Sequence, residues 1–168
     1  MNHTTARTAD YKLGDSIFRV TYGDITRIQA DALVSSDDNY LSMGGGVSLA
    51  LLNAGGEVIR TEARKHVPLR LGDVAVTSAG ALRAKYIFHA VTIDYDKMTY
   101  AAQDSIHAAT LKCLQLADTL GVRLIAFPAL GTGVARFPFQ LAAEVMTRTV
   151  ADYLVGETGI ELVILTLY

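Results

Sequence analysis

Short apolar runs with strand character alternate along this chain with segments that repeat apolar residues at helical spacing. The predicted strands are 16–22, 30–34, 73–78, 85–92, 123–127 and 160–167, and the predicted helices are 46–53, 57–66, 101–120 and 138–154. Strands that alternate with helices favour parallel pairing, because each parallel connection needs a crossover. We therefore expect an α/β fold, a three-layer α/β/α sandwich with a mixed, mostly parallel sheet of about six strands.

The 168 residues are most simply organised as one domain. A chain of this length can bury about two thirds of its unfolded surface without a disulfide or a metal. We expect a polar N-terminal segment at 1–15 and a single domain at 16–168. The sequence stops on a strand at Tyr168 without a covering helix, which hints at further domains beyond Tyr168 in a longer protein.

Charge and cysteine content narrow the classes of partner. With 15 basic and 17 acidic residues the net charge is −2, so no basic field attracts nucleic acid, and a small ligand is favoured. The single cysteine, Cys113, cannot form an internal disulfide, which fits a reducing compartment. No segment approaches a membrane-spanning length. We expect a cytoplasmic location and no membrane partner.

Two glycine-rich turns each follow an apolar strand and precede a helix. The first contains Gly44, Gly45 and Gly46, and the second runs from Pro128 to Val134 with Gly131 and Gly133. Glycines let a ligand approach the backbone, and free N–H groups at a helix start favour a phosphate. A single turn of this kind more often serves only to connect a strand to a helix. Two such turns in one domain predict a clamp for a diphosphate.

A polar run, Ser35-Ser36-Asp37-Asp38-Asn39, comes directly after the apolar strand 30–34. In open α/β sheets, ligands bind at the carboxyl ends of the strands. The same residue types also form turns, so the run is equally explained as a cap on the strand's end.

Four ordered motifs resemble those of a macrodomain. They are Gly23-Asp24-Ile25-Thr26, Gly44-Gly45-Gly46-Val47, the run 72–77 leading to His89-Ala90-Val91, and the run 128–134. The resemblance covers about 16–168. It implies an α/β/α sandwich that binds ADP-ribose, and some members of the family hydrolyse ADP-ribosyl bonds or O-acyl esters of ADP-ribose.

The resemblance assigns roles to the site residues. Asp24 matches the carboxylate that accepts the adenine amino group, with the N–H of Ile25 beside it, although Asp24 alone would be interpreted as a turn cap. The glycine loops would hold the diphosphate from opposite sides. The ligand-binding residues implied are Asp24, Ile25, Asp38, Asn39, Gly44, Gly45, Gly46, Val47, Ser48, Gly131, Thr132, Gly133, Val134, Ala135, Arg136 and Phe137.

Departures from the family pattern gather at the positions that face the distal ribose. The family usually has Asn-Ala-Ala-Asn where this chain has residues 35–38, an Asp in many hydrolytic members where it has Ser48, and an aromatic residue then glycine where it has Ala135 and Arg136. Asp37 or Asp38 is a candidate general base. These acids could also admit Mg²⁺ or a cationic group, but solvent contact is the commoner role, and we expect no metal and no cofactor.

Other residues have alternative interpretations. His89 lies in an apolar strand and is expected to be a satisfied core histidine rather than a catalyst. Phe137 lines the site or packs in the core. Arg136 pairs with Asp37 or Asp38 across the pocket, binds an extra phosphate or carboxylate of the ligand, or forms an exposed salt bridge. Tyr95 and Tyr100 are placed where a ring can stack on a ligand.

The sequence supports three functional hypotheses. The first is a module that binds ADP-ribose, free or on an ADP-ribosylated macromolecule, without efficient chemistry. The second is an ADP-ribosyl or O-acyl-ADP-ribose hydrolase that uses Asp37 or Asp38. The third is a binder of a different signalling nucleotide derived from NAD.

Overall fold

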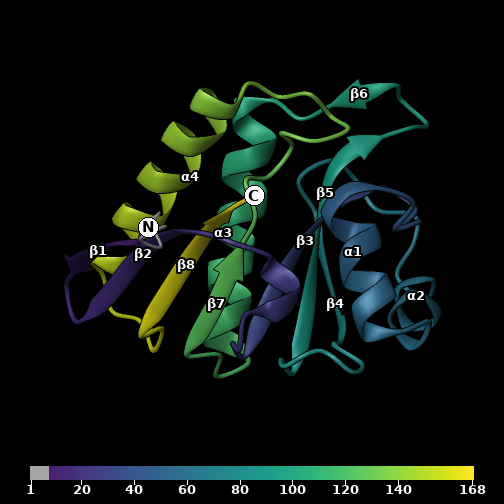
Figure 1. Ribbon diagram of the computed structural model, residues 1–168. Coiled ribbons are helices and arrows are strands. Elements are labelled where there is room, and N and C mark those ends of the chain that lie inside the picture. The colour runs from purple at the N-terminus through teal and green to yellow at the C-terminus, as the bar shows by residue number, and fades with distance from the viewer. Residues whose placement is uncertain (1–7) are drawn as a thin grey trace, which may run out of the picture.

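The computed structural model describes residues 8–168 and has a central sheet between two layers of helices (Figure 1). Its elements are β1 (Thr8–Leu13), β2 (Ser16–Tyr22), η1 (Ile25–Arg27), β3 (Ala32–Asp38), α1 (Gly46–Gly55), α2 (Val58–Ala63), β4 (Val74–Ser78), β5 (Tyr86–Asp94), β6 (Thr99–Tyr100), α3 (Gln103–Thr119), β7 (Leu124–Phe127), α4 (Phe139–Leu154) and β8 (Leu162–Leu167).

Within the described residues the strands form one eight-stranded sheet in the order β1-β2-β8-β7-β3-β5-β4, and β6 pairs with β5. The four central pairings, from β2 through β8, β7 and β3 to β5, are parallel. The pairings of β1, β4 and β6 are antiparallel. The predicted α/β/α sandwich with a mixed, mostly parallel sheet is therefore confirmed.

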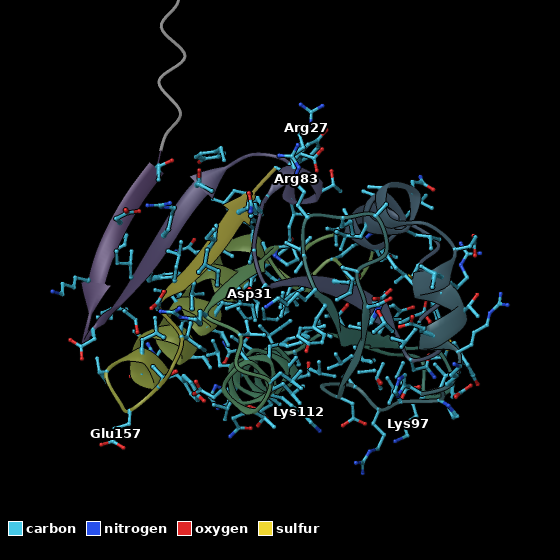
Figure 2. All side chains as sticks on the ribbon, turned by 90° about the horizontal axis from the view of Figure 1, so that it is seen from below. Arg27, Asp31, Arg83, Lys97, Lys112 and Glu157 are labelled. Carbon is cyan, nitrogen blue, oxygen red and sulfur yellow. The ribbon has the colours of Figure 1, made fainter. Side chains whose placement is uncertain are left out.

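Successive side chains along a strand point to opposite faces of the sheet, so they contribute to two apolar layers, one on each face. On β3, Ala32 and Val34 belong to the cluster beneath α3 and α4, whereas Leu33 joins the cluster beneath α1 and α2. Figure 2, which views the molecule from below, shows helices on both sides of the sheet. Because apolar groups cover both faces, β7 and the first three residues of β3 are apolar on both sides rather than alternating with polar residues.

Strands β1 and β6 extend the sheet beyond the six strands predicted. Residues 8–13 fall within the predicted polar N-terminal segment 1–15, but they pair with β2 in register from Thr8 with Thr21 to Leu13 with Ser16. Most of β1 is exposed, so its backbone hydrogen bonds hold it in place without any apolar periodicity in the sequence. The sheet therefore begins before residue 16. Strand β6 has two residues, too few to carry a pattern.

The long helix α3 ends as the sequence predicts. Gly121 has a φ of 69° and its N–H bonds to the carbonyl of Asp118, while the N–H of Val122 bonds to the carbonyl of Ala117. These two bonds form a Schellman motif, for which glycine is the usual residue.

None of the helices in residues 8–168 is long and apolar enough to cross a membrane.

Candidate functional site

A cavity of about 870 Å³ lies at the carboxyl ends of the parallel strands. Its lining comprises residues 23–25 after β2, 166–168 at the end of β8, 128–129 and 131–135 after β7, 36–38 at the end of β3, 92–93 in β5, and residues 42, 44–48, 50, 95 and 139. Strands in a sheet are about 4.8 Å apart, so the four steps from β2 to β5 span roughly 19 Å. The cavity therefore suits an elongated ligand that lies across the sheet.

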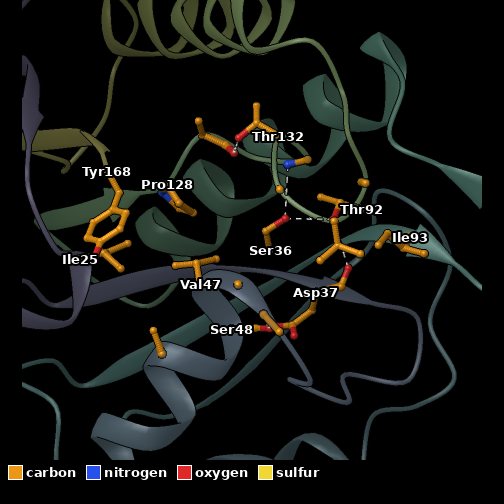
Figure 3. A pocket seen from close by; sticks show the side chains of 18 of the residues that line it. Ile25, Ser36, Asp37, Val47, Ser48, Thr92, Ile93, Pro128, Thr132 and Tyr168 are labelled. Atoms are coloured by element: carbon orange, nitrogen blue, oxygen red, sulfur yellow. Dashed lines mark hydrogen bonds between the residues drawn. The ribbon is translucent and has the colours of Figure 1, made fainter.

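Ile25 and Tyr168 lie at one end of the cavity, above β2 and β8 (Figure 3), and Asp24, which precedes Ile25, also lines the cavity. Asp24 is the N-cap of η1, and its Oδ1 accepts bonds from the N–H of Thr26 at 2.9 Å and from Thr26 Oγ1 at 2.7 Å. These two bonds lower the pKa of the Asp24 carboxyl group. Oδ2 is contacted by the Nε atom of Arg27 at 3.8 Å. Asp24 thus caps η1 through Oδ1 and also lines the cavity.

The first glycine loop leads into α1, with Gly45 as the N-cap. Gly46, Val47 and Ser48 are the first residues of this helix, so their N–H groups have no partner inside it. All three residues line the cavity. Ser48 Oγ donates to the carbonyl oxygen of Gly45 at 2.8 Å, which turns the hydroxyl toward the loop. The loop presents backbone N–H groups and the positive end of the helix dipole to the cavity.

The second glycine loop lies after β7 and closes on itself. The N–H of Arg136 bonds to the carbonyl of Gly133 at 2.9 Å, and that of Phe137 bonds to the carbonyl of Gly131 at 2.8 Å. Gly131 has a φ of 74°, and a Cβ atom there would lie 2.7 Å from the Cβ atom of Ala101. Glycine is required at this position both by the backbone conformation and by the lack of space.

The two glycine loops approach each other across the cavity. A Cβ atom built on Gly45 would lie 3.8 Å from Val134 Cγ2, which is ordinary van der Waals contact. Within residues 8–168, no lysine, arginine or histidine lines the cavity. A bound anion would therefore meet backbone N–H groups rather than basic side chains.

Ser36 and Thr92 join the second loop to the sheet. The hydroxyl groups of these two residues lie 2.9 Å apart, and the N–H of Gly131 donates to Ser36 Oγ at 3.3 Å (Figure 3). Thr92 Oγ1 also donates to the carbonyl of Asp37 at 3.3 Å. These bonds connect β3, β5 and the loop after β7 beneath the middle of the cavity.

Asp38 is bonded to the loop that follows β3. Its Oδ1 accepts from the N–H of Tyr40 at 2.8 Å and from that of Ser42 at 3.4 Å, and its Oδ2 accepts from Ser42 Oγ. This loop holds Leu41 and Met43 at φ values of 49° and 53°, which are costly for residues other than glycine. The contacts favour the turn-cap interpretation of Asp38 that the sequence left open.

Asp37 is fully buried and pairs with a buried histidine. Its Oδ2 lies 2.9 Å from His89 Nδ1, and His89 Nε2 lies 2.9 Å from Thr77 Oγ1. His89 is thus a core histidine with a hydrogen-bond partner on each ring nitrogen. One of these partners, Asp37, also lines the cavity. The other carboxylate oxygen of Asp37, Oδ1, is buried and has no hydrogen-bond partner in the described part of the chain.

The sequence comparisons identify the family. The Macro domain family model matches residues 34–146. The chain belongs to the Macro domain family. It is 38% identical over 148 residues to an uncharacterized protein of Sulfolobus acidocaldarius, covering 85% of this chain and 80% of that protein. It is 42% identical over 135 residues to an uncharacterized protein of Saccharolobus solfataricus, covering 78% and 75% respectively.

Solved macrodomain structures share the fold. The Oceanobacillus iheyensis macrodomain with ADP superposes with a TM-score of 0.89 at 23% identity, covering 98% of this chain and 90% of that chain. The Trypanosoma brucei macrodomain in complex with ADP-ribose gives a TM-score of 0.80 at 22% identity, covering 89% and 63% respectively. At these identities the likeness concerns the fold alone.

Most of the residues predicted to bind the ligand meet around the cavity of this macro domain, but three do not line it. Asn39 is buried, and its side chain bonds to Asp96 Oδ2 and to the N–H of Tyr95. Arg136 is exposed with a φ of 53°, and Phe137 packs against the core beneath α3 and α4. The ligand-binding role of the remaining residues stays a prediction.

The sequence reasoning missed several residues that line the cavity, among them Phe139, Thr166 and Tyr168. Pro138 is the N-cap of α4, so Phe139 starts the helix with its ring at the cavity while Phe137 turns to the core. Tyr95 lines the cavity as expected, whereas Tyr100 on β6 does not. Two aromatic residues around one proline were the available signal for Phe139.

Proposed function

We propose that this macro domain binds ADP-ribose, free or attached to a macromolecule. The observation that carries the proposal is the order of groups along one cavity. An acceptor carboxylate at Asp24 comes first, two amide-bearing glycine loops follow, and the polar ends of β3 and β5 come last. ADP-ribose has the same order of chemical groups: an amino-bearing purine, a diphosphate and a sugar.

The end at Asp24 matches a purine nucleoside. Oδ2 of Asp24 is free of strong internal bonds and can accept the exocyclic amino group of adenine. A bond of this charge-assisted kind contributes about 1.5–3 kcal/mol. Tyr168 lines the same end and offers a ring face for stacking on the base.

The middle of the cavity matches a diphosphate. The N–H groups of Gly46, Val47 and Ser48 open α1, and Gly133, Val134 and Ala135 face them from the second loop. Helix N-termini with free N–H groups are common phosphate sites. Two loops on opposite sides allow both phosphates to be contacted without a basic side chain.

Binding has more support than hydrolysis. Both oxygens of Asp38 bond to the loop that follows, so this carboxylate is poorly placed to take a proton from water. The hydroxyl of Ser48 donates to the carbonyl oxygen of Gly45 and is therefore already engaged. Asp37, the other candidate base, is buried and bonded to His89. We therefore infer recognition of ADP-ribose without efficient turnover.

Calorimetric titration with ADP-ribose tests the proposal, with ADP, cyclic ADP-ribose and NAD titrated in parallel. We expect ADP-ribose to bind more tightly than NAD or the cyclic compound. Tighter binding of a cyclic or phosphorylated analogue would instead favour a different NAD-derived nucleotide. The absence of measurable heat with every nucleotide would overturn the proposal. Release of ADP-ribose from ADP-ribosylated proteins by the purified chain would contradict binding without turnover.

A further inference from the structure

Asp37 combines a fixed carboxylate oxygen with an unpartnered one at the edge of the cavity. His89 Nδ1 holds Oδ2 at 2.9 Å, and Thr77 Oγ1 holds the opposite ring nitrogen of His89 at 2.9 Å. The side chains of Asp37 and His89 are both fully buried. Oδ1 of Asp37 has no hydrogen-bond partner among the described residues, although Asp37 lines the cavity.

A buried acceptor without a donor is costly, and folded proteins satisfy the great majority of such atoms. The cost is larger for a carboxylate than for a carbonyl. The neighbouring Asp38 shows how this chain satisfies such a group when it serves the fold, since loop donors occupy both of its oxygens. Asp37 differs because its second oxygen is left for a donor that the described chain does not supply.

The position of Asp37 fixes which part of a ligand can supply the donor. Asp24 lines the cavity directly after β2, beside Ile25. Ile25 and Asp37 lie at opposite ends of the view in Figure 3, with Val47 of the first glycine loop and Thr132 of the second between them. A ligand with its base at Asp24 and its diphosphate at the loops therefore brings its far group to Asp37. A Cβ atom at Gly46 would have no neighbour within 4 Å, so there is open space beside the backbone of the first glycine loop.

We propose that Asp37, held by His89, determines which group is accepted beyond the diphosphate. Oδ1 accepts a hydrogen bond from a sugar hydroxyl and disfavours an anion at the same place. The inference rests on the proposed binding of ADP-ribose and adds a specificity-determining residue to it.

His89 acts as a positioning residue in this arrangement. Its bond to Oδ2 fixes the carboxylate so that Oδ1 is the oxygen available to the ligand. An asparagine at position 89 can place an amide N–H near the position of Nδ1, whereas leucine cannot donate. Thr77 lies on β4, which pairs with β5, and its hydroxyl holds the other ring nitrogen of His89.

Calorimetry with three probes separates the two ends of the ligand. ADP lacks a group beyond the diphosphate, ADP-ribose carries a hydroxyl-bearing sugar there, and ATP carries an anion. For the unmodified protein we expect ADP-ribose to bind at least about tenfold more tightly than ADP, and ATP more weakly than ADP. The ratio of ADP-ribose to ADP affinity is the readout, because a loss of folded protein changes both affinities together.

Variants at positions 37 and 89 test the assignment. Asp37→Ala is expected to bring the ratio close to 1 while changing the ADP affinity less than about threefold. Asp37→Asn keeps the size of the side chain and should remove the discrimination against ATP, which keeps the test open if the alanine variant does not fold. His89→Leu should lower the ratio and His89→Asn should restore it.

Asp31→Asn is the matched control. Asp31 precedes β3 at its amino end, away from the cavity, and accepts bonds from the N–H groups of Arg123 and Leu124 (Figure 2). The substitution Asp31→Asn removes one acid near the same strand. It should leave the ratio of ADP-ribose to ADP affinity and the discrimination against ATP unchanged. A ratio near 1 in the unmodified protein, or an unchanged ratio in Asp37→Ala and Asp37→Asn, would overturn this inference. Absence of binding to both ADP and ADP-ribose would instead overturn the proposed function.

Discussion

Thr26 donates two hydrogen bonds to one oxygen of Asp24, from its N–H at 2.9 Å and from its hydroxyl at 2.7 Å. Both bonds reach Oδ1, so the cap on η1 and the proposed contact with adenine use different oxygens of the same carboxylate. The two roles can therefore be separated by a substitution that changes only Oδ2.

Asp24→Asn makes this separation. The amide oxygen can still accept from Thr26, while an N–H₂ group replaces the acceptor proposed for adenine. We expect at least about a tenfold loss of ADP-ribose affinity, or about 1.4 kcal/mol, with an unchanged melting temperature. Titration calorimetry and thermal unfolding measure the two quantities. An affinity equal to that of the unmodified protein would show that Oδ2 does not recognise the base.

Gly45 and Gly131 predict opposite outcomes for added side chains. Gly45 has an extended backbone with a φ of −166°, and the nearest atom to an added Cβ is 3.8 Å away on Val134. Gly45→Val should therefore fold normally but fill the space between the loops. We expect ADP-ribose affinity to fall about 100-fold or more, with little change in the melting temperature.

Gly131→Ala should instead damage the fold. Its φ of 74° and the 2.7 Å approach to Ala101 Cβ require both a strained backbone and a displaced neighbour. A loss of about 1–3 kcal/mol in the free energy of unfolding is expected. Urea unfolding of both variants checks the contrast. Equal destabilisation by the two substitutions would contradict the geometry of the loops.

The sequence was sufficient for elements that carry an apolar pattern. The six predicted strands and four predicted helices are all present, because buried apolar groups produce the pattern and also drive the folding. Strand β1 carries no such pattern, since Thr8–Leu13 is held mainly by backbone bonds to β2. Periodicity cannot detect a strand whose side chains are mostly exposed.

The site was predictable where backbone geometry defines it and less so where side chains choose between partners. The glycine turns fall at the predicted places because glycine itself sets the turn. Asp37 and Asp38 are adjacent and identical in type, yet one bonds to His89 and the other to its own loop. Neighbouring residues of a strand point to opposite faces of the sheet, and the pairing of β3 with β5 also shifts register between these two, so the sequence does not show which partner each acid meets.

Ser36 links β3 to the second glycine loop through the hydrogen bond from the N–H of Gly131, and we expect this bond to order the loop. Ser36→Ala removes the acceptor for the N–H of Gly131 and the partner of Thr92 Oγ1. We expect faster hydrogen exchange at the Gly131 amide and a several-fold loss of ADP-ribose affinity, because the loop is less well ordered. Hydrogen exchange measured by NMR tests this. Unchanged protection at Gly131 would mean that the 3.3 Å bond does not hold the loop.

The contact between Glu62 and Ser78, which lies outside the cavity lining, should make the free energy of unfolding depend on pH. The N–H and hydroxyl of Ser78 donate to the two oxygens of Glu62 at 2.7 and 2.8 Å, which fastens α2 to β4. These bonds lower the pKa of Glu62 in the folded protein. A lowered folded pKa means that the contribution is present above the unfolded value and is lost as the pH falls through the folded value.

Glu62→Gln keeps an acceptor for the N–H of Ser78 but removes the charge. At pH 7 the variant should be less stable by about 1 kcal/mol, a value reduced for partial exposure to solvent, and the difference should shrink as the pH falls through the lowered folded pKa of Glu62. Urea unfolding from pH 3 to pH 7 measures it. The exposed Glu157 is the control, since Glu157→Gln should shift neither end of the curve (Figure 2). A difference for Glu62→Gln that does not shrink with falling pH would assign the effect to packing rather than to charge.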